Sequence, residues 1–199
     1  IGICGGSGSG KTTLVEAVRA HLSNDLISVI SQDSYYKNHD SLTFEERCKL
    51  NYDHPNAIDY DLFVLHLKQL IGGKSIHPPI YSYSEHLRSD QFIEVFPKPV
   101  VLVEGILIFA HTPLREQFTT TIFIDAEDDT RLSRRMARDI QTRGRSAQEV
   151  RQRFKDTILP MHNTHIQPHK ETSDYIFDNN KDDLSRLSSF CKLVRNLIK

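Results

Sequence analysis

Residues 5–13 of the chain read GGSGSGKTT, and this stretch decides the fold. Residues 5–12 match the phosphate-loop pattern G-x-x-x-x-G-K-[ST] in full. A short apolar run, 1–4, comes directly before the stretch, and an amphipathic segment comes directly after it. Glycines let consecutive backbone N–H groups surround a phosphate with no Cβ in the way, and a helix that starts near Lys11 adds its positive dipole end. The stretch therefore predicts a strand, a phosphate-binding loop and a helix in direct succession.

The side chains of this loop have distinct expected roles. Lys11 is placed to reach the outer phosphates of a nucleotide, and the Thr12 hydroxyl is placed to hold Mg²⁺. A flexible Gly/Ser turn is the alternative, although a chance match at all the fixed positions is rare in a chain of 199 residues. The candidate nucleotide-binding residues are Gly5, Gly6, Ser7, Gly8, Ser9, Gly10, Lys11, Thr12 and Thr13.

The composition is that of an ordinary globular domain. At 199 residues the chain can form one sizeable core, and its 25 basic and 26 acidic residues give a formal net charge of -1. This balance gives no global attraction to nucleic acid or to a membrane. The longest apolar run, 100–110, is shorter than a membrane span and is interrupted by Glu104. The chain starts inside an expected strand with no leader before it, so we expect a few further residues upstream of Ile1.

Cysteines and histidines give little support for a disulfide framework or a zinc site. The three cysteines lie far apart with no C-x-x-C pair, which fits a reducing, cytoplasmic setting. Histidines cluster over 162–169, but Pro160 and Pro168 break the helical spacing that would align them on a metal.

Hydrophobic periodicity predicts alternating strands and helices. Amphipathic helices are expected at 12–23, 59–71 and 183–198. Buried strands rich in β-branched residues are expected at 1–4, 26–30, 100–103, 121–124 and 175–177. This alternation indicates an α/β fold with a doubly wound, five-stranded parallel sheet covered on both faces. Residues 80–83 and 92–95 resemble instead an antiparallel hairpin, inserted at about 78–96.

Two acidic residues follow predicted strands. Asp33 comes after the strand at 26–30, and Glu104 comes after the strand at 100–103. Ligands of an open parallel sheet bind beyond the carboxyl ends of its strands, so both side chains should face the phosphate loop. Mg²⁺ needs oxygen ligands there, and a substrate hydroxyl needs a proton acceptor. Each acid taken alone could instead cap a helix.

The segment 131–155 is strongly basic, with nine basic residues against two acidic ones. Planar, permanently charged arginines are suited to clamp a phosphoryl group during transfer, and a mobile lid that carries them would exclude water. A solvated helix face is an alternative. A nucleic-acid patch is another, although the segment lacks interleaved aromatic residues.

Several motifs together resemble the uridine (uridine-cytidine) kinases, a family of P-loop kinases. They are GGSGSGKTT at 5–13, SQDSYYK at 31–37, NYDHPNAID at 51–59, PIYSYSEHLR at 79–88, VLVEGIL at 101–107 and DTRLSRRMARDIQTRGR at 129–145. The phosphate loop is shared by many nucleotide-binding proteins, whereas YDHP followed by Y-x-Y-x-x-H is much more specific. The resemblance implies transfer of the γ-phosphate of ATP or GTP to the 5′-hydroxyl of uridine or cytidine, with Mg²⁺.

The resemblance also implies roles for individual residues. The catalytic residues would be Asp33, as the base, with Lys11 and Arg138, and Arg138 would also contact the nucleotide. Mg²⁺ would be surrounded by Thr12, Asp33 and Glu104. The nucleoside would be bound by Asp33, Tyr36, Asp53, Tyr81, Tyr83, His86, Arg135, Arg143 and Arg145. Asp53 would hold the ribose hydroxyls, Tyr81 and His86 would read the pyrimidine edge, Tyr83 would pack on the ring, and Arg88 would support the pocket.

The same resemblance implies one kinase domain over 1–199, with a lid at about 128–155 and a strand order of 2-3-1-4-5. It also implies a homotetramer whose partners are small molecules and not nucleic acid or a membrane. Two positions depart from the family pattern. Arg153 stands where the family usually has a glutamine that contacts the nucleoside, and Asp178-Asn179-Asn180 replaces a Pro-Arg-Gly after the last strand. The choice between ATP and GTP therefore stays open.

Two competing functions are compatible with the loop. A sister P-loop kinase would act on another alcohol, such as phosphoribulose, pantothenate or nicotinamide riboside, but Tyr81 and His86 would then lack a purpose. A nucleotide-dependent regulator would bind without transfer, but it would have little use for Asp33 at the acceptor position.

Overall fold

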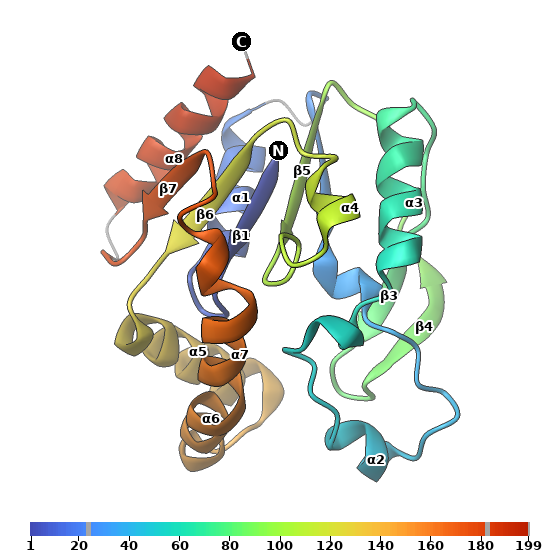
Figure 1. Ribbon diagram of the computed structural model, residues 1–199, viewed down its shortest axis with the longest axis vertical. Helices are drawn as coiled ribbons and strands as arrows, with labels where there is room; N and C mark the ends of the chain where they lie inside the picture. Colours follow the sequence, from blue (N-terminus) through green and yellow to red (C-terminus); the bar gives the residue numbers. More distant parts are fainter. Residues whose placement is uncertain (23–24, 182–183, 199) are drawn as a thin grey trace.

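A parallel sheet of five strands forms the centre of the computed structural model, which is described over residues 1–22, 25–181 and 184–198 (Figure 1). The spatial order of the strands is β2-β5-β1-β6-β7. Their bounds are Gly2–Gly5 for β1, Ile27–Ser31 for β2, Val100–Gly105 for β5, Thr121–Asp125 for β6 and Tyr175–Asp178 for β7. Without the two hairpin strands this is the expected order 2-3-1-4-5, and each predicted strand is confirmed to within two residues.

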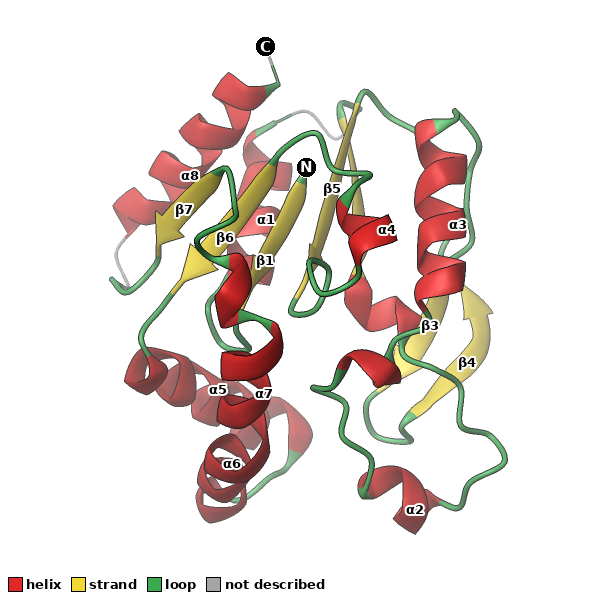
Figure 2. Cartoon of the chain, viewed as in Figure 1, coloured by secondary structure: helices red, strands yellow, loops and turns green. Residues whose placement is uncertain are grey.

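Helices cover both faces of the sheet, which confirms the doubly wound fold (Figure 2). On one face, α1 (Lys11–His21) and α8 (Leu184–Leu197) pack Leu14, Val18 and Phe190 into a buried cluster with strand residues. On the other face, α3 (Tyr60–Ile71) and α4 (Thr112–Arg115) contribute to a second cluster. The predicted helices at 12–23 and 183–198 correspond to α1 and α8, although residues 23 and 183 lie outside the described part.

The inserted hairpin is present, but its second strand was predicted too late in the chain. β3 spans Pro79–Ser82 and pairs antiparallel with β4, which spans Leu87–Phe92 rather than 92–95. Tyr83 and His86 therefore lie in the turn, where His86 adopts a φ of 53°. Most of β4 is polar and its second half is exposed, so hydrophobicity could not mark it, and the apolar residues that suggested a strand lie largely in solvent.

The lid segment consists of helices that lie beyond the carboxyl ends of the strands, opposite the hairpin and α2 (Phe44–Cys48) (Figure 1). They are α5 (Asp128–Arg143) and α6 (Ala147–Arg153), and a π-helical turn (Phe154–Ile158) and α7 (Leu159–His165) follow them. Pro160 lies in the first turn of α7, where its missing N–H is tolerated. Two groups of elements thus face each other across the edge of the sheet where ligands bind.

Short 3-10 helices complete the fold at Gln32–Tyr35, Pro55–Ala57 and Gln167–His169. In the described ranges we find no helix with the length and apolar character needed to cross a membrane.

Candidate active site

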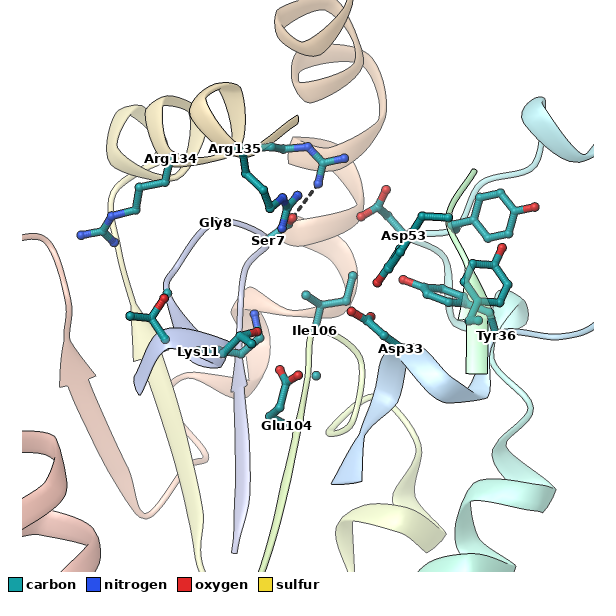
Figure 3. Close-up of a pocket in the computed structure, with 18 of the residues that line it drawn as sticks. Ser7, Gly8, Lys11, Asp33, Tyr36, Asp53, Glu104, Ile106, Arg134 and Arg135 are labelled. Carbon is teal, nitrogen blue, oxygen red and sulfur yellow. Dashed lines mark hydrogen bonds between the residues drawn. The ribbon is translucent and has the colours of Figure 1, made fainter. Parts of the chain in front are cut away.

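A cavity of about 630 Å³ lies between the phosphate loop, the lid helices and the hairpin (Figure 3). Most of the predicted site residues line it: Ser7, Gly8, Gly10, Lys11, Thr12, Thr13, Asp33, Tyr36, Asp53, Tyr81, Tyr83, His86, Glu104, Arg135, Arg138 and Arg145. Gly5, Gly6 and Ser9 are buried in the loop behind this wall. Arg143 ends α5, and its side chain lies outside the described part of the structure.

The phosphate loop wraps around the start of α1. Gly8 and Gly10 have φ angles of 82° and 89°, a left-handed conformation that favours glycine. The Lys11 Nζ donates hydrogen bonds to the carbonyl oxygens of Gly5 at 2.9 Å and Gly6 at 3.1 Å. Burial lowers the pKa of Lys11. The loop therefore presents a helix N terminus and a buried ammonium group to the cavity, which together form an anion site.

Asn179 holds the outer side of this loop, a role that the sequence did not indicate. Its side-chain amide donates to the Ser9 carbonyl at 2.6 Å, and its backbone N–H donates to the Asp125 carbonyl at 2.8 Å. The one feature of the sequence that could have drawn attention to Asn179 is its position after the last predicted strand, at the edge of the sheet where ligands bind. The departure from the family pattern at this position thus contacts the phosphate loop directly.

Asp33 and Glu104 are tied together by one hydroxyl. The Ser31 Oγ donates to the Glu104 Oε1 at 2.7 Å and accepts a hydrogen bond from the Asp33 backbone N–H at 3.3 Å. Burial, and next the charge of Asp33, raise the pKa of Glu104, while the charge of Lys11 opposes this shift. Glu104 lies inside β5 rather than after it, and Ser31 is the N-cap of the helix at Gln32–Tyr35. The helix-capping alternative is therefore wrong for Glu104, whereas Asp33 does lie in the first turn of this helix, although the capping side chain is that of Ser31.

The chemistry of these groups fits a magnesium ion. Thr12, Asp33 and Glu104 offer hydroxyl and carboxylate oxygens on one wall of the cavity, and Mg²⁺ binds through one or two carboxylates together with phosphate oxygens and water. Within the described ranges, no cluster of three or more His, Cys, Asp or Glu side chains is arranged to hold a metal by itself.

Aromatic side chains form the opposite end of the cavity. The ring of Tyr36 lies edge-on to Tyr52 at 5.6 Å between centroids, and it is tilted against Tyr81 at 4.9 Å. Tyr52 stacks on His86, with centroids 4.9 Å apart and an interplanar angle of 14°. Tyr83 meets Tyr81 edge-on at 5.6 Å. Sequence reasoning passed over Tyr52, although it lies inside the NYDHP motif directly before Asp53.

Arg88 and Arg47 fix this aromatic end. Arg88 donates from Nε to the Tyr36 carbonyl at 2.8 Å and from Nη2 to the Asp59 Oδ2 at 3.0 Å. Arg47 donates to the Glu85 carbonyl at 3.0 Å and thereby holds the hairpin turn. The supporting role expected of Arg88 agrees with these contacts, whereas that of Arg47 was missed.

The lid arginines gather around Asp139, whose carboxylate is fully buried. In the sequence, Asp139 was noted only as one of the two acidic residues of the basic segment 131–155. Asp139 oxygens lie 2.9 Å from the Arg138 Nε, 3.3 Å from the Arg135 Nε and 3.7 Å from the Arg145 Nη1. Arg135 also donates from Nη1 to the Ser7 Oγ at 2.6 Å. Arg135 and Arg145 are largely buried, so the alternative of a solvated helix face is wrong for these two side chains.

Three further arginines line the cavity, two of them from the predicted basic segment but without an assigned role and one from outside it. They are Arg134, which donates to the Ser9 carbonyl at 3.5 Å, Arg153 at the end of α6, and Arg186 of α8. The cavity thus combines two carboxylates near a phosphate loop with an unusual density of guanidinium groups.

A phosphate loop after the first strand of a 2-3-1-4-5 sheet, two acids beside it and an arginine-bearing lid over it define a P-loop phosphotransferase. The comparison with known proteins narrows this class. A model described as the phosphoribulokinase / uridine kinase family matches residues 1–185, and the chain belongs to this family.

Two curated relatives support the same assignment. A protein named uridine kinase from Ligilactobacillus salivarius (strain UCC118) is 42% identical over 199 residues, which cover 100% of this chain and 93% of the relative. A uridine kinase from Bacillus cereus (strain AH187) is 46% identical over 176 residues, which cover 88% of this chain and 83% of the relative.

Solved structures show the same fold at low sequence identity. A D-glycerate 3-kinase from Cryptococcus neoformans var. grubii superposes with a TM-score of 0.65 at 19% identity, covering 90% of this chain and 84% of that structure. At this identity the likeness concerns the fold alone.

Proposed function

We propose that the chain transfers the terminal phosphoryl group of ATP or GTP to the 5′-hydroxyl of uridine or cytidine. The observation that carries this proposal is the position of Asp33 in the cavity, which has the phosphate loop on one side and the aromatic residues on the other (Figure 3). The names of the curated relatives support the nucleoside as acceptor.

On the donor side, the loop amides and Lys11 bind the phosphates. Arg138 is anchored on Asp139 at 2.9 Å and lies on the cavity wall, which suits it to stabilise the charge that spreads over the moving phosphoryl group. The fixed positions of these donors mean that little reorganisation is needed when the charge develops.

On the acceptor side, Asp33 orients the 5′-hydroxyl and accepts its proton. Asp53 is buried on the same wall, and it accepts hydrogen bonds from the ribose hydroxyls. Tyr81 and His86 recognise the edge of the base, and Tyr83 packs on its ring, since aromatic faces stack on a pyrimidine and an imidazole offers one donor and one acceptor. Arg135 and Arg145 line the cavity and would contact the nucleoside, and Arg143 is proposed for the same role from the resemblance alone.

The residues Thr12, Asp33 and Glu104 would hold Mg²⁺. When bound, the ion neutralises charge on the phosphates of the donor. Within the protein, the hydrogen bond from Ser31 and the positive charge of Lys11 favour the ionised form of Glu104 and oppose the rise in its pKa that burial and the charge of Asp33 cause.

Two alternative functions are less well supported. A kinase for phosphoribulose or another alcohol would leave the ring of aromatic side chains at the hairpin without a partner. A regulator that binds a nucleotide without transfer would not need a second compartment of the cavity, next to Asp33, that is lined by Tyr36, Tyr81 and His86.

A panel assay tests the proposal. The protein is incubated with Mg-ATP or Mg-GTP and one of uridine, cytidine, deoxyuridine, adenosine, ribulose 5-phosphate or pantothenate, and products are resolved by chromatography. We expect UMP or CMP in stoichiometric amounts and a large loss with deoxyuridine, because Asp53 would lose a hydrogen-bond partner. Nucleotide binding without any phosphorylated product would favour the regulator.

We also propose that residues 1–199 act as one kinase domain, with the hairpin at about 78–96 and the lid at about 128–155, in the cytoplasm and as a homotetramer. Free cysteines, two buried and one exposed, support a reducing compartment. The tetramer rests on the family resemblance, and multi-angle light scattering tests it.

A further inference from the structure

Close packing, and not backbone conformation, requires a glycine at position 6. The residue falls outside the positive-φ set that contains Gly5, Gly8 and Gly10. A Cβ built on Gly6 would lie 2.9 Å from the Arg131 Cζ and 2.9 Å from the His162 Nδ1, and closer still to the Arg131 Nη1. A side chain at this position is therefore excluded by Arg131 of α5 and His162 of α7, which both lie against the loop.

Arg131 supports the loop at a second point as well. A Cβ on Gly8 would collide with the backbone carbonyl oxygen of Arg131. Since Arg131 belongs to α5, the helix that also carries the lid arginines, the backbone of the phosphate loop rests directly on the start of the lid. The loop backbone at Gly6 and Gly8 therefore packs closely against Arg131.

The Arg131 side chain is buried in a way that is costly for stability alone. It is 1% exposed, and its ion-pair partner is Asp128, at 2.5 Å, whose side chain is 55% exposed. The guanidinium lies over the Phe154 ring at 5.4 Å. In the described part of the chain, its Nε and Nη1 find no hydrogen-bond acceptor. Apolar side chains of similar volume often replace such a buried charge without loss of stability, so a functional use is the better explanation.

His162 lies next to this guanidinium, since both meet the Cβ position of Gly6. Its Nε2 is 2.9 Å from the Gln167 Oε1, and its Nδ1 faces the loop. Burial, and next the charge of Arg131, lower the pKa of His162 to about 4. The ring is therefore neutral at physiological pH, which leaves Arg131 as the cation of this cluster.

We propose that Arg131 is a positioning residue for the phosphate donor: it fixes the backbone at Gly6 and Gly8 and adds a buried positive charge behind the loop. The charge acts through protein rather than water, where electrostatic attraction to a triphosphate is stronger. This inference rests on the proposed function only in that the loop binds a nucleoside triphosphate.

The experiment compares R131M and R131K with R115M as a matched control. Arg115 also lies 5.4 Å from a phenylalanine ring, that of Phe109, and 3.1 Å from a histidine nitrogen, that of His169, but it is remote from the cavity lining. ATP affinity is measured by calorimetry without nucleoside, KM for ATP and for uridine by kinetics, and Tm by thermal unfolding.

For R131M we expect an ATP Kd and KM raised about 10-fold or more, a uridine KM within about 2-fold of the wild type, and partial recovery in R131K, which keeps the charge. R115M should lower Tm without changing ATP affinity. The proposal is overturned if R131M binds ATP as tightly as the wild type, or if both KM values rise together with a Tm loss like that of R115M.

A second variant covers the case in which R131M does not fold. G6A adds only a methyl group at a position whose φ accepts alanine, and G72A is the control at a glycine outside the site. We expect G6A to weaken ATP binding about 10-fold, whereas wild-type affinity would overturn the proposal. A chain that binds ATP in this Arg131-dependent way but phosphorylates no nucleoside would contradict the proposed function and leave this inference standing.

Discussion

The Ser7 hydroxyl accepts a 2.6 Å hydrogen bond from the Arg135 Nη1, so this side chain links the lid helix α5 to the phosphate loop. The same guanidinium lies 3.3 Å from the buried Asp139. Arg135 thus connects the loop with the carboxylate on which Arg138 and Arg145 also converge. The position of the lid arginines is therefore set by the loop that binds the phosphates (Figure 3).

Removal of this link should impair catalysis more than stability. In S7A, Arg135 loses this charge-assisted hydrogen bond but keeps its ion pair with the buried Asp139, which still holds the guanidinium in the fold. We expect kcat/KM to fall about 10-fold and Tm to change little, while S89A, at a half-buried hairpin serine that does not line the cavity, should behave like the wild type. Steady-state kinetics and thermal unfolding measure both, and an unchanged kcat/KM in S7A would show that the link has no role.

Replacing Tyr52 should affect the nucleoside and spare the nucleotide. The ring stacks on His86, and its hydroxyl donates to the Arg47 carbonyl at 3.1 Å. Aromatic pairs of this kind contribute about 0.5–1.5 kcal/mol beyond the area they bury. In Y52L we expect the uridine KM to rise about 10-fold with an unchanged ATP KM. Y52F keeps the stacked ring, so its uridine KM should rise by less than about 3-fold. Equal uridine KM values for Y52L and the wild type would remove Tyr52 from the site.

Stability should fall as the pH drops from about 6.5 to about 4, because His162 has a pKa of about 4 in the folded protein against a usual value of 6.5. In this window the unfolded chain binds a proton at His162 that the folded chain does not, so acid favours unfolding, by up to about 3 kcal/mol. Urea unfolding at several pH values should show a flatter profile for H162Q than for the wild type, with H21Q, at an exposed histidine, as the control. Parallel profiles for H162Q and the wild type would contradict this pKa.

The sequence was sufficient for the sheet and for most of the cavity because strong local patterns mark them. The phosphate loop is marked by the fixed spacing of its glycines, lysine and threonine, which is rare outside such loops. Runs of β-branched residues mark strands that are buried on both faces. Motif resemblance then supplied the aromatic and acidic residues, of which Tyr36, Asp53 and His86 all line one cavity.

What could not be predicted depends on contacts between distant segments. Strand β4 is polar and exposed in its second half, so its register follows from pairing with β3 rather than from hydrophobicity. Asn179 and Asp139 are ordinary polar residues in the sequence, and their importance becomes visible only when the fold brings one to the Ser9 carbonyl and the other among three arginines.

The substitution Asp33→Asn tests the central claim most directly. If Asp33 is the carboxylate between donor phosphate and acceptor hydroxyl, D33N should lower kcat for uridine phosphorylation by about 10²-fold or more, while calorimetry still detects binding of ATP and of uridine. Near wild-type turnover in D33N would contradict the account.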